Sequence, residues 1–190
     1  IGDTIDGGAG TNTLFVYGTV DLTGVTLNNV TVLVVNSNVT LTPAQISNFT
    51  TIDGDGNSVI NIVIPPAFPV NFILDLSAID VSDVSRINID GDIEIVIGNI
   101  NDISGIDTIS VSAGSTLNLR VKPSGTDQEV ALGVLAETFE EIEVITIPDG
   151  VTLTVDDPVL ITDLGLTEVS GEGDIDAGGS TEVTDALDAI

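Results

Sequence analysis

Acidic side chains and glycines gather in three short segments of this 190-residue chain, at residues 2–15, 51–57 and 171–180. Carboxylate oxygens are the ligands that hard divalent cations prefer. The chain has 30 acidic and 3 basic residues, a formal net charge of −27, so some carboxylates must crowd and cations would relieve their repulsion. These segments are therefore the first candidates for cation binding. Turn geometry alone also selects Gly and Asp, so ordinary solvated turns are the alternative at each of them.

The residue types that are missing exclude several classes of site. The chain contains no Cys and no His, which excludes disulfides, Cys/His zinc sites, iron–sulfur clusters and Cys–His or Ser–His catalysis. Three basic residues cannot neutralise a run of phosphates, so we expect no nucleic-acid partner. The longest apolar stretch, residues 60–76, is interrupted by prolines, so we expect no membrane insertion. The sequence starts without Met and without a recognisable signal peptide, and we interpret it as a mature chain or a fragment.

The elements that must position these segments are predicted to be β-strands. Val, Ile and Thr account for 70 of the 190 residues, and β-branched side chains fit a pleated sheet. Aromatic residues make up only 3% of the chain, which suits a thin core of stacked aliphatic layers. The hydrophobic content of 42% argues against disorder despite the charge.

One pattern of alternating apolar residues recurs four times, starting at Val30, Val84, Ile106 and Ile142. Each copy reads as two short strands joined by a three-residue turn. A unit this small cannot cover its own apolar side, but stacked units bury a continuous core. We therefore predict an all-β fold, a parallel β-helix or β-roll-like solenoid with irregular coils that forms one elongated domain over residues 1–190. The predicted core residues are Val30, Leu33, Val35, Leu41, Ile87, Ile89, Ile95, Ile109, Val111, Leu117, Ile145, Ile147 and Leu153.

The alternative fold is an antiparallel β-sandwich, which is also built from short strands at regular spacing. Its core usually includes an aromatic pivot, and this chain supplies little for one. Short helices are predicted at 42–49, where Thr42 precedes Pro43 as an N-cap, and within 129–141. The proline-rich residues 65–69 are predicted to form an extended loop.

The first glycine-rich segment resembles the RTX nonapeptide repeat, Gly-Gly-x-Gly-x-Asp-x-apolar-x, through residues 7–14. Asn12 stands where that repeat has Asp, and Asp3-Thr-Ile5 fits the same phase one repeat earlier. The RTX repeat forms a calcium-binding parallel β-roll in exported bacterial proteins, where glycine carbonyls and Asp carboxylates hold Ca²⁺. The resemblance therefore implies Ca²⁺ as a cofactor. The implied ligands are Asp3, Asp6, Asn12, Asp53, Asp55, Asp174 and Asp176.

Most of the chain also resembles the β-solenoid regions of bacterial S-layer proteins and large surface adhesins. The resemblance rests on strands ending in Val-Thr-Leu-Thr, on Leu-Thr-Pro-Ala-Gln at 41–45 and on the Gly-Asp-Gly turn at 54–56. It implies a structural, self-assembling, non-catalytic module in the extracellular space or on the bacterial cell surface. Its implied partners are other copies of itself, head-to-tail or in a lattice, and a cell-surface polysaccharide. Residues 173–179 resemble residues 2–8, as if a next unit began there, which favours head-to-tail stacking.

Two other functions are open at this point. A β-helix enzyme acting on polysaccharide would use paired carboxylates, with basic groups to bind an acidic sugar. The basic residues Arg120 and Lys122 alternate on a predicted strand and can face one side, where salt bridges to the acidic surface are the alternative. An ice-binding domain would use Thr-x-Thr pairs such as 40/42 and 152/154, although the copies between them break this array. A carbohydrate-binding adhesin domain would instead use loops such as residues 65–69 or 122–128. Arg86, the third basic residue of the chain, is not part of the Arg120/Lys122 pair.

Overall fold

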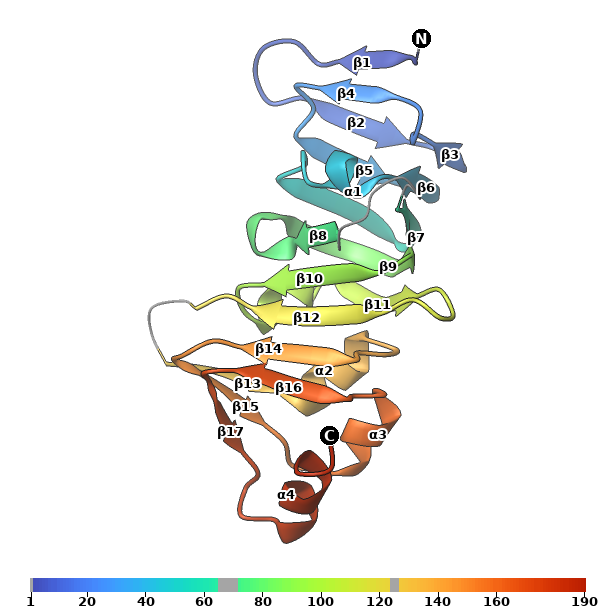
Figure 1. Cartoon of the computed structure of the whole chain (residues 1–190). Coiled ribbons are helices and arrows are strands. Elements are labelled where there is room, and N and C mark those ends of the chain that lie inside the picture. The colour runs from blue at the N-terminus through green and yellow to red at the C-terminus, as the bar shows by residue number, and fades with distance from the viewer. Residues whose placement is uncertain (1, 65–71, 124–126) are drawn as a thin grey trace.

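The computed structural model describes residues 2–64, 72–123 and 127–190, and strands dominate it. In Figure 1 the strands lie one above another along a single long axis. The seven-stranded sheet contains β2 (Thr13–Val16), β3 (Val20–Asp21), β5 (Val32–Val35), β6 (Asn38–Leu41), β7 (Thr51–Val63), β9 (Asp80–Asp90) and β11 (Ile106–Val111). The five-stranded sheet contains β8 (Phe72–Asp75), β10 (Ile93–Ile97), β12 (Leu117–Val121), β14 (Val144–Ile147) and β16 (Glu168–Gly171). Two smaller sheets consist of β1 (Thr4–Asp6) with β4 (Thr26–Asn28), and of β13 (Gln128–Ala131), β15 (Val151–Thr154) and β17 (Asp174–Asp176).

Every pairing between these strands is parallel. Each pairing joins strands from separate stretches of the sequence, as Ile87 of β9 pairs with Ile109 of β11 and Ile89 with Val111. This confirms the predicted all-β class with parallel pairing. The antiparallel sandwich is wrong for the described residues, because its hairpins would place antiparallel strands side by side. The predicted loop at 65–69 lies outside those residues.

The four sequence copies do not all stack as equivalent units. The copies that start at Val84 and Ile106 pair residue for residue. In contrast, β6 is the second strand of the first copy, and it pairs with β7. The other side of β7 pairs with β9, the first strand of the second copy, so a second strand and a first strand are aligned here. Likewise β14, the first strand of the last copy, pairs with β12, the second strand of the copy before it. From the first copy to the second, and again from the third to the fourth, the motif is displaced by one strand position in the stack. The segments between these copies are longer and contain β7 and α2, which occupy the additional positions.

One turn of the motif is longer than predicted. Ile93 starts the second strand of the copy at Val84, and its partner on β12 is Leu117. The alignment of the copies by sequence had placed Ser115 at that position. The turn before β12 therefore holds two more residues than the Asp-Gly-Asp turn before β10.

A continuous core of mostly aliphatic side chains, with Phe49 and Phe139 among them, runs along the stack from Val16 to Val183. Twelve of the thirteen predicted core residues are buried, and the thirteenth, Val111, is partly buried and packs against the same cluster. Successive side chains of a strand point to opposite faces, so a slip of one residue would have reversed this pattern. The strand phase predicted from the apolar alternation is therefore confirmed.

Both predicted helices are present. Thr42 caps α1 (Pro43–Ile46) by accepting a hydrogen bond from the backbone of Gln45, and the Gln45 side chain accepts one from the backbone of Thr42. Gln45 is buried, and its amide group also donates to the carbonyl oxygens of Leu22 and Val25. This side chain thus links α1 to the segment between β3 and β4. The second predicted helix is α2 (Leu132–Thr138), although the residues before it form β13.

Four further helical segments complete the fold. Val183 of α4 is fully buried in the common core, and Figure 1 places this helix at the C-terminal end of the stack. The segments are the 3-10 helices η1 (Leu76–Ala78) and η2 (Ile100–Ile103) and the helices α3 (Val159–Asp163) and α4 (Thr181–Leu187).

The seven-stranded sheet is irregular where β9 passes between two glycines. A Cβ atom on Gly54 of β7 would lie 2.0 Å from the carbonyl oxygen of Asp83 in β9. On the other side of β9, a Cβ atom on Gly105 would lie 2.0 Å from the carbonyl oxygen of Val81. Asp83 has a φ of 52°, and the pairing register of β7 shifts just after Asp53. The two glycines therefore let the bulged backbone of β9 pack against both neighbours.

Candidate functional site

The N-terminal glycine-rich segment folds into a turn between β1 and β2. Asp6 ends β1, and its Oδ1 accepts hydrogen bonds from the Asn29 side chain at 2.8 Å and from the backbone of Gly8 at 2.9 Å. These bonds, the one from Asn29 above all, hold the pKa of Asp6 below its ordinary value. Asp3 lies in the exposed residues that precede β1. The carboxylate of Asp6 is therefore ionised and already organised by the turn.

Asn12 lies at the centre of the same turn. Its Nδ2 is 2.8 Å from the carbonyl oxygen of Asn29, 3.2 Å from that of Gly10 and 3.3 Å from that of Gly8. Three carbonyl oxygens that converge on one point form an environment that suits a hard cation, and here an amide group fills that point. Gly7 permits the close packing, because a Cβ atom there would lie 2.5 Å from the Cβ of Asn12. Asn12 thus acts as a hydrogen-bond donor in this structure, where the RTX-like pattern implied an oxygen ligand.

We expect Asn12→Asp to make this turn calcium-dependent. Without metal, a carboxylate that faces three carbonyl oxygens loses their hydrogen bonds, at a cost of about 1 to 2 kcal/mol. With Ca²⁺, the carboxylate and the carbonyls contribute to one oxygen shell. Thermal unfolding should show the variant melting below the wild type in chelator and gaining more from added calcium. Equal calcium responses of the two proteins would show that this point does not take a cation.

The second segment forms the bulge of β7. Asp53 accepts a hydrogen bond at 2.8 Å from Oγ of Ser82 on the neighbouring strand β9. Asp55 instead accepts bonds from the side chain of Ser58 and the backbone of Asn57, which hold its pKa below the ordinary value. The two predicted ligands therefore accept hydrogen bonds from different donors: Asp53 from β9, and Asp55 from its own turn. The two glycines of this segment are explained by the close approach of Gly54 to β9 and by the positive φ of Gly56.

The third segment repeats the geometry of the first. Asp174 and Asp176 are exposed on β17, and Ile175 lies between them. Oδ1 of Asp176 accepts the backbone N–H of Gly178 at 2.8 Å, as Oδ1 of Asp6 accepts the N–H two residues further on. In both turns that glycine has a positive φ. The two segments therefore form matching strand-and-turn units at opposite ends of the stack (Figure 1).

The seven implied ligands lie in three separate places. They belong to the turn after β1, to the bulge of β7 and to β17, which Figure 1 shows far apart along the long axis. Within residues 2–64, 72–123 and 127–190, no group of three or more acidic side chains is arranged to hold a metal ion. A single copy of the chain therefore does not gather these residues into one metal centre.

The first Thr-x-Thr pair does not present two free hydroxyls. Thr42 is the N-cap of α1, and its hydroxyl bonds within the capping box. Thr40 lies on β6 in register between Asp21 and Asn61. The outward column at this position is therefore mixed in chemistry and contains no continuous row of threonines.

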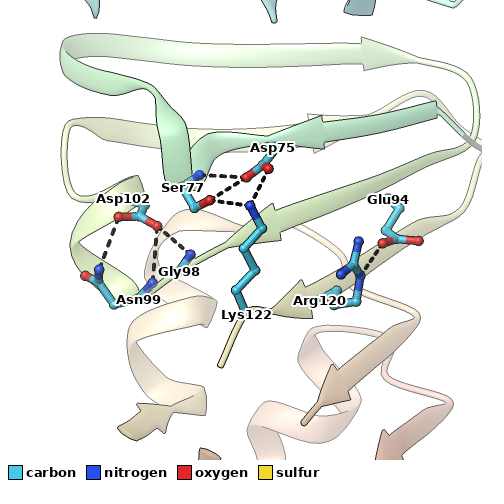
Figure 2. A network of polar contacts seen from close by, with 8 residues as sticks. All are labelled: Asp75, Ser77, Glu94, Gly98, Asn99, Asp102, Arg120 and Lys122. Atoms are coloured by element: carbon cyan, nitrogen blue, oxygen red, sulfur yellow. Dashed lines mark hydrogen bonds and ion pairs between the residues drawn. The ribbon is translucent and has the colours of Figure 1, made fainter. Parts of the chain in front are cut away.

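The three basic side chains each form an ion pair with a carboxylate from a distant part of the sequence. Arg120 and Lys122 face the same side of β12, as predicted, with buried Val121 between them. Figure 2 shows Lys122 reaching across to β8 and η1, while Arg120 contacts β10. Their arrangement matches the salt-bridge alternative that the sequence offered for them. The pairs are Arg86–Glu140, Arg120–Glu94 and Lys122–Asp75.

The carboxylate of Asp75 is the centre of a small network in Figure 2. Partial burial acts to raise its pKa, but hydrogen bonds from Lys122 and Ser77 and the nearby ammonium charge outweigh this, so the pKa lies below its ordinary value. Nearby, Asp102 of η2 accepts the backbone N–H of Gly98. Lys122 links the end of β12 to β8 and η1, whereas the bond of Asp102 is local to the start of η2, and we interpret both contacts as structural.

Two surface features escaped the sequence analysis. The side chains of Phe15 and Tyr17 are 56% and 70% exposed, and their rings stack with centroids 6.3 Å apart. The spacing Phe-Val-Tyr at the end of β2 was the available signal, since alternation along an extended chain puts both rings on one face. The other feature is a groove beside α2. Its walls come from segments far apart in the sequence, so no local pattern could have indicated it.

Comparison with known proteins adds no family assignment. No protein-family model, no curated protein and no solved structure matches this chain. A functional proposal therefore rests on the fold and on the chemistry of its surface. Among the described residues, none of the helices has the length and apolar character required to cross a membrane.

Proposed function

We propose that this chain is a structural, self-assembling module of an extracellular bacterial surface protein, such as an S-layer, a filament or an adhesin stalk. In this proposal the parallel sheets form one elongated β-solenoid that is non-catalytic and stabilised by calcium. The continuous aliphatic core and the uniformly parallel pairing support the solenoid. The ion-pairing of the three basic side chains supports a non-catalytic role, because these are the groups that an acidic sugar would need.

The partners in this proposal are other copies of the chain and a cell-surface polysaccharide. The exposed, stacked rings of Phe15 and Tyr17 support the polysaccharide contact, since they offer a surface that is apolar and carries a hydroxyl. Contact between copies has the stronger support, because it follows from the two ends of the stack.

The observation that carries the proposal is the likeness of the two outermost strands. β1 and β17 share an Ile-Asp sequence followed by the same aspartate-bonded turn. Within the described residues β1 pairs only with β4, and β17 only with β15. Each terminal strand thus has one edge without a strand partner. An unpaired edge is a template for parallel pairing with another chain.

Continuing the parallel register from copy to copy defines a specific junction. It places Ile175 of one copy beside Ile5 of the next, and it would cover Ile175, which is 43% exposed. The same register brings Asp176 beside Asp6. Oδ1 of each aspartate is used within its own turn, while Oδ2 of neither is hydrogen-bonded to the described residues. Two such carboxylates repel each other unless a cation lies between them.

The test is light scattering with electron microscopy of the purified chain in about 5 mM calcium and in chelator. We expect ordered filaments or sheets that dissolve on chelation, because the net charge of −27 opposes association without cations. Thr4→Pro should abolish assembly. The carbonyl of Asp3 and the N–H of Gly7 point toward β4, so the N–H of Thr4 faces the free edge. Thr4→Val keeps that N–H and is the matched control.

A charge-neutral junction tests the place of the cation. Asp6→Asn combined with Asp176→Asn should assemble in chelator, because the repulsion at the junction is gone. Asp80→Asn combined with Asp127→Asn removes the same charge from exposed positions outside both terminal strands, and this protein should still require calcium. A wild-type chain that stays monomeric at high concentration with calcium present would refute the proposal.

A further inference from the structure

Two adjoining cavities flank helix α2 and form one groove, which we call the α2 groove. The larger cavity, of about 600 Å³, lies between α2 and α3, and the smaller, of about 380 Å³, lies between α2 and the segment from η2 to β11. Figure 1 shows α2 and α3 on the same side of the stack. The cavities share Glu137 and Thr138 as lining residues. Together they have the size of a site for a ligand or for several side chains of a partner.

The α2 groove combines an apolar floor with acidic walls. Ala136 and Leu160 contribute apolar surface to the larger cavity, and Val134, which is 42% exposed, contributes to the smaller one. Glu137 and Asp163 supply carboxylates. This pairing of surfaces matches a side chain that has an aliphatic stem and a cationic head, as Lys and Arg do.

The rim of the groove already holds one cation of the chain itself. Glu140 lines the larger cavity and forms an ion pair with Arg86 at 2.8 Å. Within the described residues no basic side chain pairs with Glu137 or Asp163. The groove therefore has unneutralised negative charge beside apolar surface, in a place where a guanidinium is already bound.

A buried hydroxyl supplies the second, independent feature. Thr138 is only 9% exposed and lies in the wall that the two cavities share. Its side chain makes no hydrogen bond to the described residues, although buried polar groups are normally paired. It is also not among the fully enclosed unpaired atoms, so the hydroxyl reaches the cavity. A ligand in the groove would satisfy it.

We propose that the α2 groove binds a basic, amphipathic peptide segment of a partner protein. A Lys or Arg head lies between Glu137 and Asp163, apolar neighbours cover Ala136 and Leu160, and the hydroxyl of Thr138 bonds a polar group of the peptide. A second copy of this chain does not fit the groove, because its own basic side chains are already paired. The proposal concerns a different surface and partner from the end-to-end junction, so each can fail without the other.

The test uses a fluorescently labelled synthetic peptide of alternating Lys and Leu, with the intact chain kept in chelator at about 0.15 M salt to screen long-range attraction. Fluorescence anisotropy gives the dissociation constant. Glu137→Gln combined with Asp163→Asn should weaken binding by about tenfold. Glu172→Gln combined with Asp185→Asn removes the same charge from exposed residues outside both cavities, and it should change binding by less than about twofold.

Two further measurements separate the groove from general attraction to an acidic protein. Ala136→Phe fills the floor without changing the charge and should weaken binding by about fivefold, with circular dichroism checking that the fold is kept. A Lys–Ser peptide, which lacks the apolar side chains, should bind more weakly than the Lys–Leu peptide. Equal losses in the groove variant and the charge control would overturn the proposal. So would equal affinity for the two peptides, or no binding of the Lys–Leu peptide by the wild type.

Discussion

Ile145→Asp is expected to unfold the protein. Ile145 is fully buried in β14 and lies in register between Leu119 of β12 and Val169 of β16. An aspartate there exchanges apolar contacts for a carboxylate with no partner, at a cost of about 5 kcal/mol or more. That cost is comparable with the whole stability of a typical domain. Urea unfolding followed by circular dichroism measures the loss.

Thr146→Asp is the matched control on the same strand. Thr146 points out of the core, beside Arg120 of β12, so a carboxylate there is hydrated and lies near a guanidinium. Its hydroxyl bonds that of Ser170, and a carboxylate can accept the same bond. The stability should therefore change by less than about 1 kcal/mol. The reverse outcome for the two variants would place β14 in the opposite phase.

The inward faces of the strands were predictable because they depend on local alternation alone. Val, Ile and Leu at every second position select one buried face, and the buried residues of β5, β12 and β14 follow that pattern. The neighbour of each strand was not predictable in the same way. β6 and β14 lie one position away from where the sequence copies suggested, because the path of the intervening segments decides the stacking. That path depends on contacts such as those of Gln45, which no periodicity encodes.

In the candidate site too, the features that depend on local contacts were predictable from the sequence and those that depend on distant contacts were not. The Asp-bonded turns at Asp6 and Asp176 were implied by the short-range pattern of Asp and Gly, since the bond spans only two residues. The role of Asn12 depends on the carbonyl of Asn29, which follows β4, so the sequence pattern could not show which groups its amide would contact. Thr138 and the α2 groove likewise require α3, η2 and β11 to be placed first.

Gly54→Ala is the second substitution with a large expected effect. The new Cβ atom would lie 2.0 Å from the carbonyl oxygen and 2.7 Å from the carbonyl carbon of Asp83. β9 cannot shift away, because the backbone of Gly105 packs closely against its other side. The packing there is so close that a Cβ atom on Gly105 would lie 2.0 Å from the carbonyl oxygen of Val81. The backbone of β9 is packed on both sides, so it cannot move away from the new Cβ atom as the flexible end of a side chain could. We therefore expect a loss of about 3 to 4 kcal/mol in the free energy of unfolding, measured in urea.

Gly114→Ala separates this steric effect from the loss of a glycine as such. Gly114 has a φ of 86° and lies in the turn before β12, with no atom within 4 Å of the position of a Cβ. Alanine there meets only backbone strain, about 1 kcal/mol. If Gly54→Ala cost no more than Gly114→Ala, β9 would have to be free to move, and the glycines of residues 51–57 would need another explanation. A larger loss at Gly54 would instead show that this glycine is needed for the packing of β7 against β9. Calcium sites would then be sought at the two ends of the stack.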